Sequence, residues 1–258
     1  MDCMEINKVT KDFGGLRALT SVHFNVPEKR ITGIIGPNGA GKTTLFNVIT
    51  GVYPPTEGSV DFYREKITGL PPHSIARKGI VRTFQQLRVF SNLTVLENVI
   101  AGRHIKTTSG LWENLIDSHS VQEEREKSID LALKLLNYVG LIKKGELLVK
   151  NLPYGEQRLV EIARALAAKP RLLLLDEPAA GMNPAEMTRL MEIIREVNET
   201  GATVLIIEHN MRVIMNISEL IMVLDHGEKI AVGLPSEIKN HPRVIEAYLG
   251  REAGSVRY

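Results

Sequence analysis

The sequence has very few cysteines, little net charge and no long apolar run. Cys3 is the only cysteine among 258 residues, so no disulfide can form within one chain, which suits a reducing compartment. The 32 Lys and Arg residues nearly balance the 30 Asp and Glu residues, which leaves a formal net charge of +2. Because no basic run stands out, nucleic acid is not an expected partner.

No segment of the sequence resembles a membrane anchor. The longest apolar runs, such as residues 172–175, are far shorter than the roughly 20 residues that a spanning helix needs. The N-terminus begins Met1-Asp2-Cys3 and has no positive region before an apolar stretch, so no signal peptide is expected. Any role at a membrane would therefore come through a partner protein.

The first third of the chain is predicted to consist of short strands with tight connections. Apolar and polar residues alternate over residues 22–26, whereas residues 31–35 form an apolar run that ends at a glycine. A further strand is predicted at residues 59–63. The helical pattern is expected to begin near Lys42.

The middle of the chain, residues 94–140, is predicted to be mostly helical. Apolar residues that share one helix face are Ile129, Ala132, Leu133, Leu136 and Val139. Residues 103–128 are polar and include the only tryptophan, Trp112. They are interpreted as an inserted helical piece whose charges lie on a solvated face.

The second half alternates strands with helices. A helical stripe is formed by Leu159, Ile162, Ala163 and Leu166. Residues 172–175 and 204–207 are predicted to be buried strands, and a helix is predicted from Pro184, since proline suits the first turn. This alternation favours an α/β fold with a largely parallel sheet. Without a linker or a repeat, the chain is interpreted as one domain, 1–258, with a helical subdomain at about residues 88–165.

The clearest motif is a glycine-rich loop between a predicted strand and a predicted helix. The pattern G-x-x-x-x-G-K-[ST] is matched by Gly36, Pro37, Asn38, Gly39, Ala40, Gly41, Lys42 and Thr43, and Thr44 follows. Glycines let backbone N–H groups converge on phosphate oxygens, and the helix start adds the positive end of its dipole. Lys42 is expected to reach the β- and γ-phosphates and Thr43 to bind Mg²⁺. A chance glycine-rich turn is a poor alternative, so the loop predicts ATP and Mg²⁺ as ligands.

Two acidic residues follow the apolar strand at residues 172–175. Asp176 leaves the strand and can hold Mg²⁺ through water. Glu177 can orient or deprotonate the attacking water as a general base. Acids at a strand end are common, and this pair becomes strong evidence only together with the glycine-rich loop.

Further motifs, in the same order, make the chain resemble the ATP-binding subunits of ABC transporters. Residues 152–158, Leu-Pro-Tyr-Gly-Glu-Gln-Arg, stand where that family has its signature, usually LSGGQ. Gln85 after Phe84 resembles the glutamine loop, and His209 after Glu208 resembles the switch histidine. Residues 180–183 occupy the place of the family's D-loop.

The resemblance implies an ABC ATPase fold, which is a P-loop core with an antiparallel β subdomain and a helical signature subdomain. It implies that Glu177 and His209 are catalytic and that Phe13 stacks on adenine. Residues implied to contact Mg²⁺ are Thr43, Gln85 and Asp176. Signature residues implied to act on the ATP of a second subunit are Pro153, Tyr154, Gly155 and Glu156, of which the first two replace the usual Ser and Gly.

Longer matches resemble the importers of branched-chain amino acids, at residues 13–19, 82–85, 208–211 and 241–250. They imply an ATP-hydrolysing motor subunit that forms a head-to-tail dimer with an identical or paralogous subunit. Membrane permease subunits are the other implied partners. The implied location is cytoplasmic, on the inner face of the cell membrane.

Several alternatives stay open. The chain could serve a related transporter, for lipopolysaccharide export or urea uptake, or it could be a soluble ABC protein, although such proteins usually carry a long coiled-coil insert or two fused cassettes. A P-loop GTPase would need a motif such as N-K-x-D, which is absent. Phe13 could be a core residue, Gln86 could take the place of Gln85, and His209 could be a capping or buried structural residue.

Overall fold

The computed structural model describes residues 1–105 and 119–252, so Trp112 and the centre of the predicted insert lie outside the described residues. The chain divides into two compact units, and each is described by itself. The first comprises Met1–Arg82, Arg171–Ala179 and Ile194–Tyr258, and the second comprises Thr83–Pro170 and Ala180–Ile193. The helical subdomain predicted at about residues 88–165 lies within the second.

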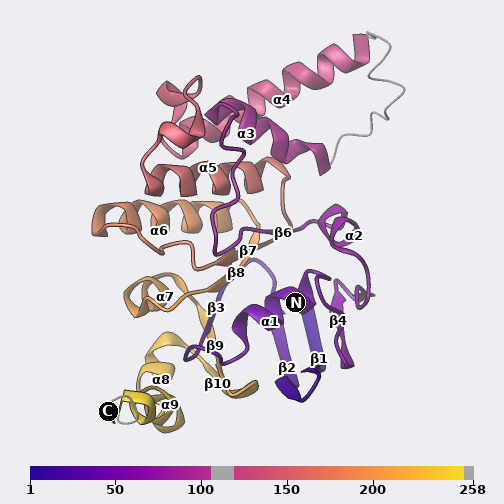
Figure 1. Ribbon diagram of the computed structural model, residues 1–258, viewed down its shortest axis with the longest axis vertical. Coiled ribbons are helices and arrows are strands. Elements are labelled where there is room, and N and C mark those ends of the chain that lie inside the picture. The colour runs from indigo at the N-terminus through magenta and orange to yellow at the C-terminus, as the bar shows by residue number, and fades with distance from the viewer. Residues whose placement is uncertain (106–118, 253–258) are drawn as a thin grey trace. The chain divides into compact units, whose positions relative to one another are not determined.

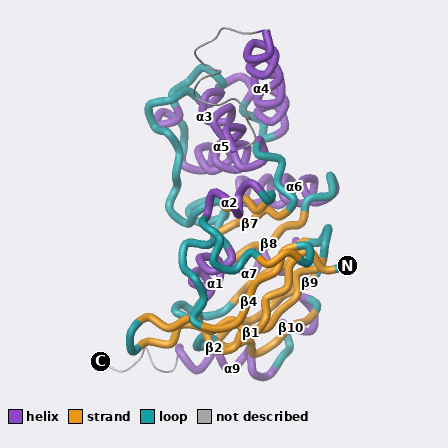
Figure 2. Tube along the Cα trace, turned by 90° about the vertical axis from the view of Figure 1, so that its right-hand side faces the viewer, coloured by secondary structure: helices purple, strands orange, loops and turns teal. Residues whose placement is uncertain are grey.

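The first unit contains a four-stranded antiparallel sheet in the order β2-β1-β4-β5. Its strands are β1 (Asp2–Phe13), β2 (Leu16–Pro27), β4 (Glu57–Phe62) and β5 (Glu65–Lys66). Figure 2 shows β1, β2 and β4 running alongside one another. The prediction of short strands here is wrong, because β1 and β2 each span 12 residues.

The length of β1 and β2 is hard to predict from the sequence because their pairing is irregular. The register shifts between Ile6 and Val9, and Lys8 has a left-handed φ of 48°. Ser21 on the neighbouring strand has a φ of 46°. Such bulges add a residue to one strand and reset the alternation of faces, so the apolar pattern breaks although the pairing continues.

The second sheet of this unit has six strands in the order β10-β9-β3-β8-β7-β6. Its strands are β3 (Ile31–Ile35), β6 (Ile80–Arg82), β7 (Leu172–Asp176), β8 (Thr203–Ile207), β9 (Leu220–Asp225) and β10 (Glu228–Gly233). All neighbours pair in parallel except β9 and β10. Every residue of β3, β7 and β8 is buried, which confirms the predicted buried strands and the largely parallel sheet.

Helix α1 (Lys42–Ile49) joins the two sheets into one core. Leu45, Phe46 and Ile49 belong to a single buried apolar cluster that also contains side chains of both sheets. The unit's other helices are α2 (Pro72–Arg77), α7 (Met211–Ile217), α8 (Pro235–Lys239) and α9 (Pro242–Glu252). Because α1 follows directly on β3, this core fixes the direction in which the glycine-rich loop leaves the sheet.

The second unit is helical. Its helices are α3 (Val95–Ala101), α4 (His119–Tyr138) and α5 (Tyr154–Ala167), with short 3-10 turns at Gly102–Ile105, Ile142–Lys144 and Val149–Asn151. These three helices pack against one another, as Figure 1 shows. Helix α6 (Pro184–Glu199) begins at Pro184 as predicted. Leu133 is an error in the predicted apolar face of α4, because it is 39% exposed whereas Ala132, Leu136 and Val139 are buried.

Candidate nucleotide-binding and catalytic site

Two glycines give the phosphate loop its shape. Gly36 and Gly41 have φ angles of 152° and 100°. A Cβ on Gly36 would lie 2.1 Å from the carbonyl oxygen of Leu224, and one on Gly41 would lie 2.7 Å from that of Ala18. Both positions therefore require glycine for its conformation and for the close approach of backbone. A Cβ on Gly39 would meet no atom within 4 Å, so this turn of the loop is open.

Lys42 lies inside the loop. Its Nζ donates hydrogen bonds to the carbonyl oxygens of Gly36 and Pro37, at 2.7 and 3.0 Å, and the residue is buried. Gly41 is the N-cap residue of helix α1 and has no side chain to cap the N–H groups of the first turn. A buried ammonium group beside an uncapped helix start suits an anion such as a phosphate.

The residues present fit a magnesium-bound triphosphate. Thr43 is exposed on the first turn of α1, so its hydroxyl is accessible. Within the described ranges there is no group of three His, Cys, Asp or Glu side chains that could hold a metal ion by itself. Mg²⁺ keeps several waters and usually takes one or two protein oxygens together with phosphate oxygens. Thr43 and Asp176 suit that mode of binding.

Asp176 makes a buried ion pair that the sequence reasoning missed. Nη2 of Arg82 lies 2.7 Å from Oδ2 of Asp176, and both side chains are buried. Nη1 of Arg82 bonds to Oδ1 of Asn47 at 2.7 Å and to the Thr50 hydroxyl at 3.3 Å. Arg82 thus connects the acidic end of β7 to α1. The only sign of a role for Arg82 in the sequence was its position three residues before Gln85.

Glu177 and His209 come together at the ends of adjacent parallel strands. The two side chains approach to 3.5 Å between Oε2 and Nδ1. Glu177 has a φ of 48°, uncommon for a residue with a side chain, and its N–H donates to the carbonyl of Ile207 at 2.9 Å. The His209 side chain is 58% exposed, so it is no buried structural residue, and Glu177 is 18% exposed. Both can be reached by water.

Phe13 is an exposed aromatic residue and not part of the core. It is 39% exposed, and its ring meets that of Tyr53 edge-on at a centroid distance of 5.2 Å. Nζ of Lys11 lies 5.0 Å from the Phe13 ring centroid. A presented ring of this kind is suited to stacking on a base, and that role stays a prediction.

Gln85 and the signature residues belong to the second unit. Arg158, which is buried on α5, donates to the carbonyl oxygens of Phe84 and Gln85. It also pairs with Glu161 at 2.9 Å. The backbone that carries Gln85 is therefore tied to the helix that begins with the signature, a link the sequence did not predict.

The unusual signature forms the start of α5. Pro153 is the N-cap residue and makes no side-chain cap. The ring centroid of Tyr154 is 5.5 Å from the Arg158 guanidinium. A Cβ on Gly181 would lie 3.1 Å from the Tyr154 ring. Both carboxylate oxygens of Glu156 accept from Nζ of Lys144 at 2.6 Å.

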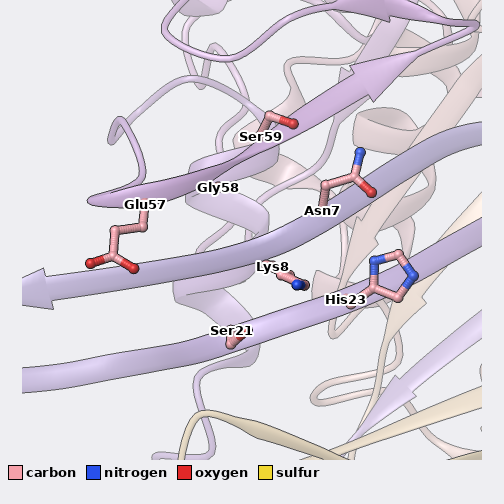
Figure 3. Close-up of a pocket in the computed structure, with 7 residues that line it drawn as sticks. All are labelled: Asn7, Lys8, Ser21, His23, Glu57, Gly58 and Ser59. Carbon is pink, nitrogen blue, oxygen red and sulfur yellow. The ribbon is translucent and has the colours of Figure 1, made fainter.

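A hollow on the antiparallel sheet is lined by none of these residues. Figure 3 shows its lining, and its volume is about 460 Å³. Asn7 and Ser59 at its rim both bond to Asp61. The hollow contains none of the predicted site residues.

Residues 19–180, which include the phosphate loop, the signature and the acidic pair, match the family model described as ABC transporter. The chain belongs to the ABC transporter family. A second model, described as branched-chain amino acid ATP-binding cassette transporter, matches residues 228–254 of the cassette.

Known relatives match over nearly the whole cassette. It is 43% identical to the high-affinity branched-chain amino acid transport ATP-binding protein LivG of Salmonella typhimurium, over 96% of this chain and 97% of the relative. It is 42% identical to BraF of Pseudomonas aeruginosa, a protein with the same description, over the same shares of the two chains. A probable LivG of Archaeoglobus fulgidus is 36% identical over 99% of this chain and 98% of the relative.

Solved structures agree with the fold. A nucleotide-free ATP-binding cassette from an ABC transporter superposes with a TM-score of 0.84 at 35% identity, over 96% of this chain and 99% of the other. A dimeric bacterial ABC transporter cassette has a TM-score of 0.76 at 29% identity, over 90% and 98%. Among residues 1–105 and 119–252, no helix combines the length and the apolarity that crossing a membrane requires.

Proposed function

We propose that this cassette is the ATP-hydrolysing subunit of an importer for branched-chain amino acids. The observation that carries the proposal is the 43% identity to LivG of Salmonella typhimurium over 96% of the chain. The match of residues 228–254 to a model specific for branched-chain amino acid cassettes supports it. Urea uptake, lipopolysaccharide export and a soluble ABC protein have no comparable support.

The phosphate loop binds the triphosphate in this proposal. Lys42 exchanges its bonds to loop carbonyls for the β- and γ-phosphates, and the first turn of α1 supplies N–H donors. Thr43 and Asp176 would hold Mg²⁺, with Gln85 as a further predicted ligand, and the ion would supply positive charge to neutralise that on the phosphates. Phe13 stacks on the adenine.

Glu177 and His209 act on the attacking water and the γ-phosphate. Glu177 accepts a proton from the water as general base, and its strained backbone aims the carboxylate out of the strand end. His209 contacts Glu177 and is exposed enough to contact the transferred phosphoryl group as well. Most of the rate enhancement comes from positioning and from neutralised charge.

The cassette pairs head to tail with a second ATP-binding subunit and binds membrane permease subunits. Support for pairing comes from the dimeric cassette that resembles it. Each ATP then lies between one subunit's phosphate loop and the other's signature, here residues 153–156. In this arrangement the cassette lies on the cytoplasmic face of the membrane.

The test is amino-acid uptake by the reassembled transporter in vesicles. ATP-dependent uptake of labelled leucine, isoleucine or valine is expected, and neither urea uptake nor lipopolysaccharide release. Glu177→Gln should abolish uptake and slow hydrolysis about 10²–10⁴-fold while leaving ATP bound. Near-normal hydrolysis by that variant would refute the assignment of the base. ATP-dependent transport of urea alone would refute the solute.

A further inference from the structure

One buried carboxylate spans the two loops that carry the catalytic residues. Oε1 of Glu208 accepts the N–H of Ala179, two residues after Glu177, at 2.8 Å. Oε2 accepts the N–H groups of His209 and Asn210, both at 3.1 Å. Each oxygen therefore serves a different loop, one after β7 and one after β8.

Glu208 is unsuited to touch the reacting atoms itself. It is fully buried, whereas Glu177 and His209 are both partly exposed. Burial raises the pKa of its carboxyl above the ordinary value, and the nearby Glu177 raises it further, while the N–H donors of Ala179 and Asn210 and the charge of His209 oppose the shift. A buried carboxylate needs hydrogen-bond donors from the protein for both oxygens, and here backbone N–H groups supply them.

We propose that Glu208 is a positioning residue for hydrolysis, which holds Glu177 and His209 in register by bonding one loop with each carboxylate oxygen. The backbone hydrogen bond from Glu177 to Ile207 fixes the strand ends, and Glu208 joins the loops beyond them. The 3.5 Å approach of Glu177 and His209 depends on that registration. A shift of about 1 Å in such a pair can cost about 10²-fold in rate.

The geometry makes Glu208→Gln a sharp test. The side-chain amide has the same shape but only one oxygen, so it can accept from one loop while its NH₂ faces the N–H of the other. ATPase turnover of the assembled transporter should fall about ten- to a hundredfold, with the affinity for MgATP unchanged within about twofold. Glu208→Asp keeps the charge but is one methylene too short to span both loops, and it should also slow turnover.

A double-substitution cycle separates positioning from a general loss of stability. If Glu208 acts through His209, the Glu208→Gln/His209→Ala variant should be no slower than His209→Ala alone. Glu219→Gln is a control for the loss of a carboxylate, because Glu219 also accepts a backbone N–H, from Ile31, but is half-exposed and lies where β3 and β9 begin, away from the site. It should leave turnover and the effect of His209→Ala unchanged.

The inference rests on the proposed function. Measuring wild type and Glu177→Gln in the same preparation distinguishes failure of the inference from failure of the proposed function. Hydrolysis by wild type that Glu177→Gln abolishes supports the proposed function whatever Glu208 does. Turnover of Glu208→Gln within twofold of wild type would overturn the inference alone. So would additive losses in the cycle, or a loss of MgATP affinity equal to the loss of turnover. A wild type without ATPase activity would overturn both.

Discussion

At the scale of single residues, the side chains around Phe13 determine that its ring is exposed. Tyr53 meets it edge-on and Lys11 lies over it, so the ring is held at the surface and not in the core. If it stacks on adenine, Phe13→Ala should weaken ATP binding by about 1–3 kcal/mol, and Phe13→Trp should preserve binding. Calorimetric titration with MgATP measures both.

Phe24→Ala is the matched control for the Phe13 prediction, because Phe24 is a buried phenylalanine of the same sheet. It should lower the free energy of unfolding by about 3–5 kcal/mol through the cavity it leaves. Phe13→Ala should not. A large loss of stability from Phe13→Ala with ATP affinity intact would contradict the stacking role.

At the scale of elements, Arg82 joins two strands and a helix. It ends β6, pairs with Asp176 at the end of β7, and bonds to Asn47 of α1. Arg82→Met removes the partner of a buried carboxylate, which typically costs about 3–5 kcal/mol. We expect denaturant unfolding to show that loss, and MgATP affinity to fall because Asp176 is no longer oriented.

Arg17→Met provides the comparison for Arg82, since it breaks an exposed ion pair with Asp12. Solvent screens such a pair, so the unfolding midpoint should hardly move. Equal losses of stability in the two variants would mean that the buried pair does not connect these elements.

The elements themselves were predictable where one periodicity continued without interruption. Strands β7 and β8 were predicted because residues 172–175 and 204–207 are continuous apolar runs, and α1 and α6 because a motif or a proline marks where they begin. Strand β1 was missed because its bulge breaks the alternation. Leu133 was misplaced because an apolar residue at the edge of a helix face satisfies the same spacing as a core residue.

At the scale of the whole molecule, the signature predicts an unequal pair of subunits. A serine at position 153 could donate a hydrogen bond to the γ-phosphate held by the partner, but Pro153 has neither a hydroxyl nor an N–H. A hydrogen bond to a charged group is worth about 1.5–3 kcal/mol, so a homodimer would lack that contribution at both sites. We therefore expect a working heterodimer, in which the site built on Lys42 and Glu177 faces a partner with an intact signature.

The measurement compares the ATPase rate of this chain alone with that of the co-purified transporter. The complex should be markedly faster. Glu177→Gln in this chain should remove more activity than the equivalent change in the partner. Equal rates for homodimer and complex, or equal losses from the two changes, would contradict the heterodimer.

The sequence by itself determined the chemistry of this protein, because the residues from Gly36 to Thr43 are contiguous and Asp176 and Glu177 adjoin a buried strand. A short contiguous segment is enough to place such groups, because a few neighbouring residues determine their own backbone conformation. The tertiary structure alone decided that Arg82 bonds to Asp176, 94 positions away, and that Glu208 bonds to Ala179, 29 positions away. Those contacts depend on which strands become neighbours in the sheet, and burial away from water makes each pairing necessary.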